Sequence, residues 1–127
     1  MTGLLNGLRV LVLEDEFLIA MDVEQICRDA GAPDVILARS LQEADAAAPT
    51  AFDAAILDLM VGGTSTSAFA GSLQKRGVPF VFASGYSELE DVQASFPGIK
   101  LVPKPYSGDD LIGALAAACG RGQRLSK

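Results

Sequence analysis

Five short apolar runs alternate with helix-like segments along this 127-residue chain, and this alternation limits the possible folds more than any other feature. The expected strands are Leu8–Leu13, Val35–Ala38, Ala54–Asp58, Pro79–Ala83 and Ile99–Val102. The helix-like segments that follow them begin at Phe17, Ser40, Ala68, Ser87 and Ser107. Strands that alternate with helices form parallel sheets with right-handed crossovers. The sequence therefore predicts a doubly wound α/β fold with a five-stranded parallel sheet.

The central run, Ala54–Asp58, is entirely apolar until its last residue, which is typical of a strand buried on both faces. Asp58 then lies at the carboxyl end of the strand, where open α/β sheets bind their ligands. An aspartate in this position can also simply accept hydrogen bonds from a turn. The residues at the other strand ends are needed to choose between these interpretations.

Polar residues that suit phosphoryl chemistry follow four of the five expected strands. Glu14 and Asp15 follow the first, Asp58 the third, Ser84 the fourth and Lys104 the fifth. Carboxylates that converge repel one another unless a cation is bound between them, and a purely oxygen ligand set favours Mg²⁺. The combination of carboxylate nucleophile, metal, ammonium and hydroxyl donor predicts a site that holds a phosphoryl group.

The composition excludes several other classes of function. Acidic residues outnumber basic ones by 16 to 10, which argues against nucleic-acid binding. The chain has no histidine, so triads that use histidine and zinc sites with histidine ligands are excluded. Residues 62–67 contain two glycines but lack the ending of a phosphate-binding loop, and we interpret them as a flexible loop before the next helix.

Length and apolar content predict one domain over residues 1–127, with a core of about 8–119 and a flexible basic tail at 120–127. We expect no membrane span and no signal peptide. Cys27 and Cys119 lie on apolar helix faces and are expected to be core thiols in a reducing compartment. These features predict a cytoplasmic protein.

Four sequence motifs together resemble the receiver domain of bacterial response regulators, over Leu8 to about Cys119. They are Val-Leu-Val-Leu-Glu-Asp-Glu at 10–16, Ile-Leu-Asp at 56–58, Phe-Ala-Ser-Gly-Tyr at 82–86 and Lys-Pro-Tyr at 104–106. The third motif is also similar to the Phe-Ala-Thr-Gly-Tyr signature of a subgroup of stand-alone receivers. The resemblance implies a flavodoxin-like receiver fold.

The resemblance also implies a role for each residue of the metal site. Asp58 would be the phosphoacceptor and a metal ligand, and Asp15 would be a direct ligand of Mg²⁺. Glu14 would hold the water shell of the metal, although this position is usually Asp in the family. Met60 would supply a backbone carbonyl.

In the same way, Ser84 would bind a phosphoryl oxygen, Lys104 would pair with the phosphoryl group, and the bond from Lys104 to Pro105 would be cis. The family usually has an aromatic switch residue where this chain has Leu101. Leucine has no hydroxyl to carry such a switch, so the role of Tyr86 and Tyr106 stays open. We expect the response to phosphorylation within residues 84–106.

The implied function is a phosphorylation switch and not an enzyme in its own right. A sensor histidine kinase or a histidine phosphotransfer protein would donate the phosphoryl group, and a downstream protein target would read it, with no contact to nucleic acid or membrane. We expect a monomer, with a dimer as the alternative. Two other functions stay open: a phosphatase of the haloacid-dehalogenase type, which needs a second acid where this chain has Met60, and a binding module that works without phosphorylation.

Overall fold

The computed structural model of the chain contains one five-stranded parallel sheet with the strand order β2-β1-β3-β6-β7. The structure describes residues 3–47, 52–84, 96, 99, 101–103 and 107–120. The strands are β1 (Arg9–Leu13), β2 (Asp34–Ala38), β3 (Ala54–Leu57), β6 (Phe80–Ser84) and β7 (Leu101–Pro103). The predicted doubly wound sheet is therefore confirmed, and β1, β3 and β6 lie side by side at its centre.

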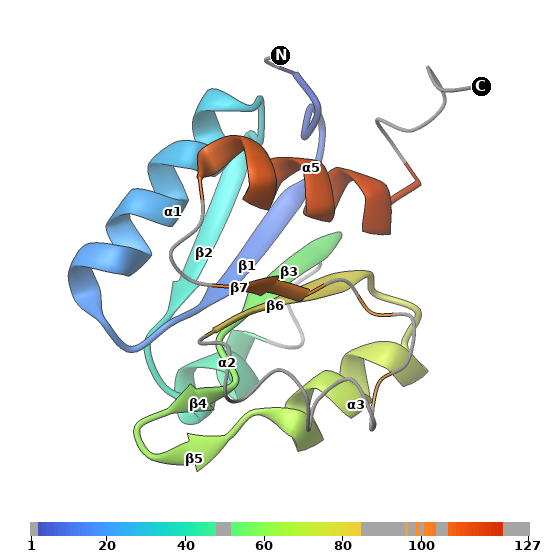
Figure 1. The fold of residues 1–127 in the computed structure, drawn as a ribbon. Coiled ribbons are helices and arrows are strands. Elements are labelled where there is room, and N and C mark those ends of the chain that lie inside the picture. Colours follow the sequence, from blue (N-terminus) through green and yellow to red (C-terminus); the bar gives the residue numbers. More distant parts are fainter. Residues whose placement is uncertain are drawn as a thin grey trace.

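Helices cover both faces of the sheet (Figure 1). They are α1 (Phe17–Asp29), α2 (Leu41–Ala47), α3 (Ser67–Lys75) and α5 (Gly108–Ala118). Helices α1 and α5 lie together on one face, and α2 and α3 lie on the other (Figure 1). None of the helices that the structure describes has the length and apolar character required to cross a lipid bilayer.

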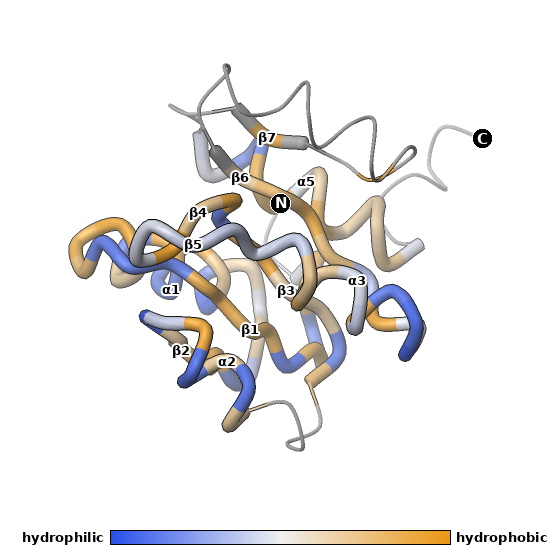
Figure 2. The backbone as a smooth tube through the Cα atoms, turned by 90° about the horizontal axis from the view of Figure 1, so that it is seen from below, coloured by the Kyte–Doolittle hydropathy of each residue, from blue (hydrophilic) through white to orange (hydrophobic). Residues whose placement is uncertain are grey.

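The core consists of two layers, because successive residues of a strand point to opposite faces of the sheet. In β1, Val10 and Val12 pack toward α1 and α5, whereas Leu11 and Leu13 pack toward α2 and α3. Both sets are almost completely buried, which explains why the run is apolar without interruption. Figure 2 shows hydrophobic residues along the central strands β1 and β3.

Leu5, which precedes β1, belongs to the core, which the sequence did not indicate. Leu5 is completely buried and packs in the layer under α1 and α5. The amides of Gly3 and Leu5 both donate to the carbonyl of Ala30, at 2.9 Å each, so this segment caps the end of α1. Gly31 follows the end of α1 with a φ of +104°, and a side chain there would collide with Asn6, so glycine is the residue that fits this helix end.

Serine residues cap the N-termini of α2 and α5. The hydroxyl of Ser107 accepts a hydrogen bond from the amide of Asp110 at 3.0 Å, and that of Ser40 accepts from the amide of Glu43 at 3.1 Å. In the usual capping box the Glu43 carboxylate would accept a hydrogen bond from the amide of Ser40. Here it accepts from the amide of the preceding residue, Arg39, at 2.8 Å.

The two cysteines differ in burial. Cys27 is completely buried in the core, as predicted, whereas Cys119 is only partly buried. Burial raises the pKa of the Cys27 thiol to about 12. The buried residues of α5 are Leu111, Ile112, Leu115 and Ala116, whereas Cys119 is the C-cap residue at the end of the helix.

The interpretation of residues 62–67 as a flexible loop was wrong in part. Strands β4 (Met60–Val61) and β5 (Thr64–Ser65) form a small antiparallel hairpin directly after β3. Gly62 and Gly63 make its two-residue turn, with φ angles of +59° and +78°. Positive φ at both central residues is typical of a type I′ turn, which matches the twist of a hairpin. The Gly-Gly pair is the sequence signal that could have predicted it.

Most of the expected helix at Ser87–Phe96 lies outside the described residues. Phe96 itself is described and is buried, and its ring packs edge-on against Phe80 and Phe82 at centroid distances of 6.0 and 5.6 Å. The end of this segment therefore contributes to the core on the side of α2 and α3.

Candidate functional site

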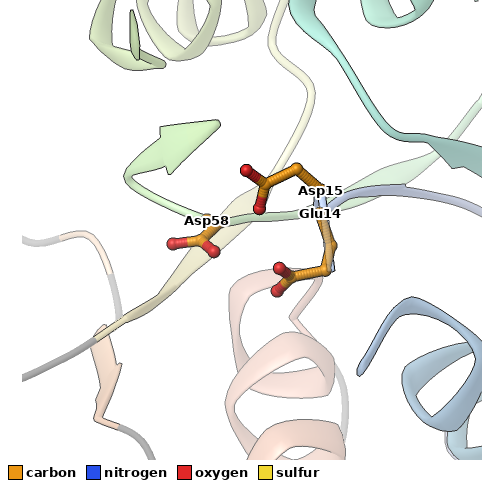
Figure 3. A group of neighbouring side chains, drawn as sticks. All are labelled: Glu14, Asp15 and Asp58. Carbon is orange, nitrogen blue, oxygen red and sulfur yellow. The ribbon is translucent and has the colours of Figure 1, made fainter. Parts of the chain in front are cut away.

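Three carboxylates meet at the carboxyl edge of the sheet, between the ends of β1 and β3. Glu14, Asp15 and Asp58 each place an oxygen within 4.8 Å of the other two (Figure 3). Glu14 is 4% exposed and Asp58 is 9% exposed, while Asp15 is partly exposed. The predicted convergence of these acids is therefore present in the structure.

The backbone of the sheet brings the acids together. Leu13 and Leu57 are partners in the β1–β3 register, so the residues that follow them leave the sheet side by side. The amide of Asp58 donates to the carbonyl of Leu13 at 3.0 Å, and the amide of Glu14 donates to the carbonyl of Ala38 at 3.0 Å. Parallel pairing thus continues just past the strands and fixes where both side chains begin.

Glu14 lies against the start of α1. One of its carboxylate oxygens, Oε2, accepts a hydrogen bond from the amide of Glu16 at 3.1 Å. Glu16 is the N-cap residue of α1, and the exposed amides of a helix N-terminus favour a negative charge nearby. This arrangement reduces the cost of burying the Glu14 carboxylate.

Asp15 is linked to the hairpin on the other side of the site. Its carboxylate oxygen Oδ2 accepts a hydrogen bond from the amide of Gly62 at 2.9 Å. Gly62 is the first residue of the hairpin turn, so the tip of the hairpin is held at Asp15.

Thr66 is a residue of the site that sequence reasoning missed. It is completely buried, and its hydroxyl Oγ1 donates a hydrogen bond to the backbone carbonyl of Asp58 at 2.6 Å, with the carbonyl of Leu59 at 3.2 Å. The sequence gives Thr64, Ser65, Thr66 and Ser67 in succession, and no local pattern distinguishes the one hydroxyl that turns inward.

The three carboxylates fit a small hard cation. Mg²⁺ binds oxygen ligands at about 2.1 Å, so two ligand oxygens on one ion lie at most about 4.2 Å apart. The observed limit of 4.8 Å requires only a small rotation of the side chains to reach that separation. The cluster is therefore compatible with Mg²⁺, whose coordination is completed by water.

The other predicted site residues are described only in part. Ser84 is the last residue of β6, next to β3, and its backbone pairs in register with Pro103 of β7. Met60 begins β4, two residues after Asp58. Lys104 and the predicted cis bond to Pro105 lie outside the described residues, as do Tyr86 and Tyr106.

Solved structures to which the chain is similar include several response regulators. The chain superposes on the receiver (REC) domain of the PhyR response regulator of Erythrobacter litoralis with a TM-score of 0.78 and 24% identity, covering 89% of this chain and 90% of that chain. The chain has the fold of a receiver domain. For a chemotaxis response regulator of Vibrio cholerae the TM-score is 0.76 at 24% identity, with 87% of this chain and 98% of that chain covered.

The response regulator PhyR of Brucella abortus is a longer protein. It matches with a TM-score of 0.76 and 26% identity over 93% of this chain, but only 51% of that chain is covered. The chain thus spans about half the length of the PhyR protein it matches. Neither a family model nor a curated protein sequence matches the chain.

Proposed function

We propose that this receiver domain is a phosphorylation switch that accepts a phosphoryl group on Asp58. The observation that carries the proposal is the convergence of Glu14, Asp15 and Asp58 at the ends of two adjacent central strands. Such a cluster favours a bound cation. Within it, the backbone of Asp58 is held by hydrogen bonds at both its amide and its carbonyl. Fold alone does not imply function, so the proposal rests on this site.

Each acid has a distinct task in the proposed reaction. Asp15 and Asp58 would bind Mg²⁺ directly, Glu14 would hold its water shell, and the carbonyl of Met60 would be a further ligand. The bound metal would neutralise the negative charge of the phosphoryl oxygens. A carboxylate oxygen of Asp58 forms the new P–O bond while the P–N bond of a phosphohistidine donor breaks. The electron pair of that bond leaves with the imidazole nitrogen, so no further reactant is needed.

Two more residues complete the proposed site at the ends of the neighbouring strands. Ser84 would donate its hydroxyl to a phosphoryl oxygen, and Lys104 would pair with the phosphoryl group as a point charge. The position of Ser84 at the end of β6, next to β3, supports its part of this assignment.

The surface beside the site supports a protein partner, for which we propose a sensor histidine kinase or a histidine phosphotransfer protein. The large apolar side chains that are exposed among the described residues are Phe17, Leu18, Met21 and Met60. Phe17, Leu18 and Met21 lie near the start of α1, shortly after Glu14 and Asp15. Met60 follows Asp58 by two residues. The guanidinium of Arg39 lies 5.0 Å from the centre of the Phe17 ring and adds a positive charge to this surface.

No feature of the described residues favours a phosphatase of the haloacid-dehalogenase type. That chemistry needs an acid two residues after the nucleophile, and this position holds Met60, which is 41% exposed in β4. We therefore propose a switch module that reacts only on itself and passes its signal to a downstream protein.

Phosphoryl transfer from acetyl phosphate, with and without Mg²⁺, tests the proposal. We expect the wild-type protein to be labelled only when Mg²⁺ is present, and D58N to take up no label. D22N is the matched control, because Asp22 is an exposed aspartate on α1 outside the acid cluster. Full labelling of D58N, or equal labelling without Mg²⁺, would refute the proposed function.

A further inference from the structure

Thr66 shares an uncommon property with two of the site acids. Among the described residues, the buried polar or charged side chains are those of Glu14, Asp58 and Thr66. Two of these carry the proposed chemistry, and the third donates its hydroxyl to the backbone of Asp58. Burial of a hydroxyl is costly unless it is hydrogen-bonded, so this contact is the reason that threonine is tolerated there.

The hydroxyl of Thr66 makes an unusual choice of partner. Thr66 is the N-cap residue of α3, where a threonine hydroxyl ordinarily accepts a hydrogen bond from an amide of the first helical turn. Here the side chain makes no such bond and turns back to the carbonyls of Asp58 and Leu59, at 2.6 and 3.2 Å. The hydroxyl of Thr66 therefore does not cap α3 and instead forms a hydrogen bond to the backbone of the proposed phosphoacceptor.

The bond from Thr66 holds the backbone carbonyl of Asp58. The backbone amide of Asp58 is held separately, because it donates to the carbonyl of Leu13 in β1. With both the amide and the carbonyl held, the direction in which the Asp58 side chain leaves the backbone is determined. The bond from the Asp58 amide continues the pairing of β1 with β3, whereas the bond to the Asp58 carbonyl depends on Thr66.

The same contact closes the base of the hairpin. The amide and hydroxyl of Thr66 both reach the carbonyl of Leu59, at 2.9 and 3.2 Å. At the other end of the hairpin, the amide of Gly62 donates to Asp15. The hairpin therefore connects the two proposed metal ligands. Thr66 at its base is bonded to the carbonyl of Asp58, and Gly62 at its tip is bonded to the carboxylate of Asp15.

We propose that Thr66 is a positioning residue for the metal site, which sets the affinity for Mg²⁺ by holding Asp58 directly and Asp15 through the hairpin. This inference rests on the proposed function, since it concerns the same acids. Residues that orient metal ligands affect metal affinity strongly, and their loss typically weakens binding by about 10-fold or more. Thr66 itself does not touch the metal.

The test compares T66V with T66S, using Mg²⁺ binding measured by calorimetry. T66V keeps the shape of the side chain but loses the hydroxyl, and we expect the dissociation constant for Mg²⁺ to rise about 10-fold. T66S keeps the hydroxyl and should stay within about threefold of the wild type. Amide hydrogen exchange should show loss of protection at Gly62 in T66V only, because the hairpin tip is then no longer held at Asp15.

Two control variants separate positioning from general stability. T64V makes the same substitution on the exposed strand β5 of the hairpin, and S72A removes a hydroxyl that donates to the carbonyl of Phe69 at 2.7 Å within α3. Both should bind Mg²⁺ as the wild type does, even where S72A lowers the melting temperature. Unchanged affinity in T66V, or a loss in T66S as large as in T66V, overturns the inference.

The wild-type protein provides a test that does not depend on the folding of T66V. Titration with Mg²⁺ should shift the amide resonances of Gly62 and Thr66 together, with the same dissociation constant. A Thr66 resonance that stays unchanged while Mg²⁺ binds overturns the role of Thr66 alone. Absence of any Mg²⁺ binding by the wild-type protein overturns the proposed function as well.

Discussion

Replacement of Asp15 by Asn should stabilise the protein in the absence of metal, because it removes one of three carboxylates that lie together. Asparagine keeps an oxygen in place to accept the hydrogen bond from the amide of Gly62. The substitution therefore changes the charge at the site and leaves this contact to the hairpin intact. The Mg²⁺-bound protein should respond in the opposite way, since a proposed ligand is lost.

The size of the effect follows from the geometry of the cluster. Two unit charges 4.8 Å apart, the outer limit for these oxygens, repel by about 0.9 kcal/mol in water and about 3.5 kcal/mol at an effective dielectric constant of about 20. Asp15 is partly exposed, so the value for water is the nearer one. Relief of repulsion from Glu14 and Asp58, less the weaker hydrogen bond from Gly62, gives a net gain of about 1–2 kcal/mol.

Thermal unfolding in the absence of divalent ions measures this gain. A change of about 1 kcal/mol shifts the melting temperature of a domain of this size by about 4 °C, so D15N should melt about 4–8 °C above the wild type. The difference should shrink at high salt, which screens the repulsion. Addition of Mg²⁺ should raise the melting temperature of the wild type and leave that of D15N almost unchanged.

D22N serves as the matched control, because it removes the same charge from an exposed position on α1. Its stability should stay within about 0.5 kcal/mol of the wild type. A D15N protein that melts below the wild type without metal, or that keeps the full Mg²⁺ shift, would refute the argument that these carboxylates repel one another and bind a common cation.

Three further predictions concern the core and the response to phosphorylation. L5A should lower the free energy of unfolding by about 2–4 kcal/mol in urea denaturation, because Leu5 is completely buried; a loss below about 0.5 kcal/mol would contradict its place in the core. Cys27 should resist alkylation at pH 8 while Cys119 reacts, because burial raises the pKa of Cys27 from 9.0 to about 12. The unfolded thiol ionises first, so the stability that this shift represents is complete below about pH 9 and is lost as the pH rises toward 12; rapid native labelling of Cys27 would show that the site is open. A phosphoryl mimic with Mg²⁺ should change amide hydrogen exchange within residues 84–106, and changes confined to α1 and α2 would contradict an output surface there.

The sequence was sufficient to predict the sheet because each strand is a dense apolar run with its own turn residues. In β1 the alternation of Val10 and Val12 with Leu11 and Leu13 serves two core layers at once, so the whole run is apolar. The acids were predictable because they stand directly at the ends of such runs. Parallel strands open on one edge, so Glu14, Asp15 and Asp58 had to meet once the sheet formed.

The features that sequence reasoning missed depend on contacts between distant segments. Leu5 looks like part of a polar start, and only its packing under α1 and α5 makes it a core residue. Thr66 is one of four successive hydroxyl residues, and its burial follows from where the hairpin returns to Asp58. The hairpin itself has strands of two residues each, too short for a periodic pattern to indicate.

The most direct test of the central claim is to identify the atom that accepts the phosphoryl group. The wild-type protein is incubated with acetyl phosphate and Mg²⁺, and the product is reduced with borohydride, which converts an aspartyl phosphate to homoserine. Peptide mass spectrometry then locates the reduced residue. We predict homoserine in place of Asp58 alone and only in samples that contained Mg²⁺. Reduction at Asp15, or no reduced residue in a protein that binds Mg²⁺, would contradict it.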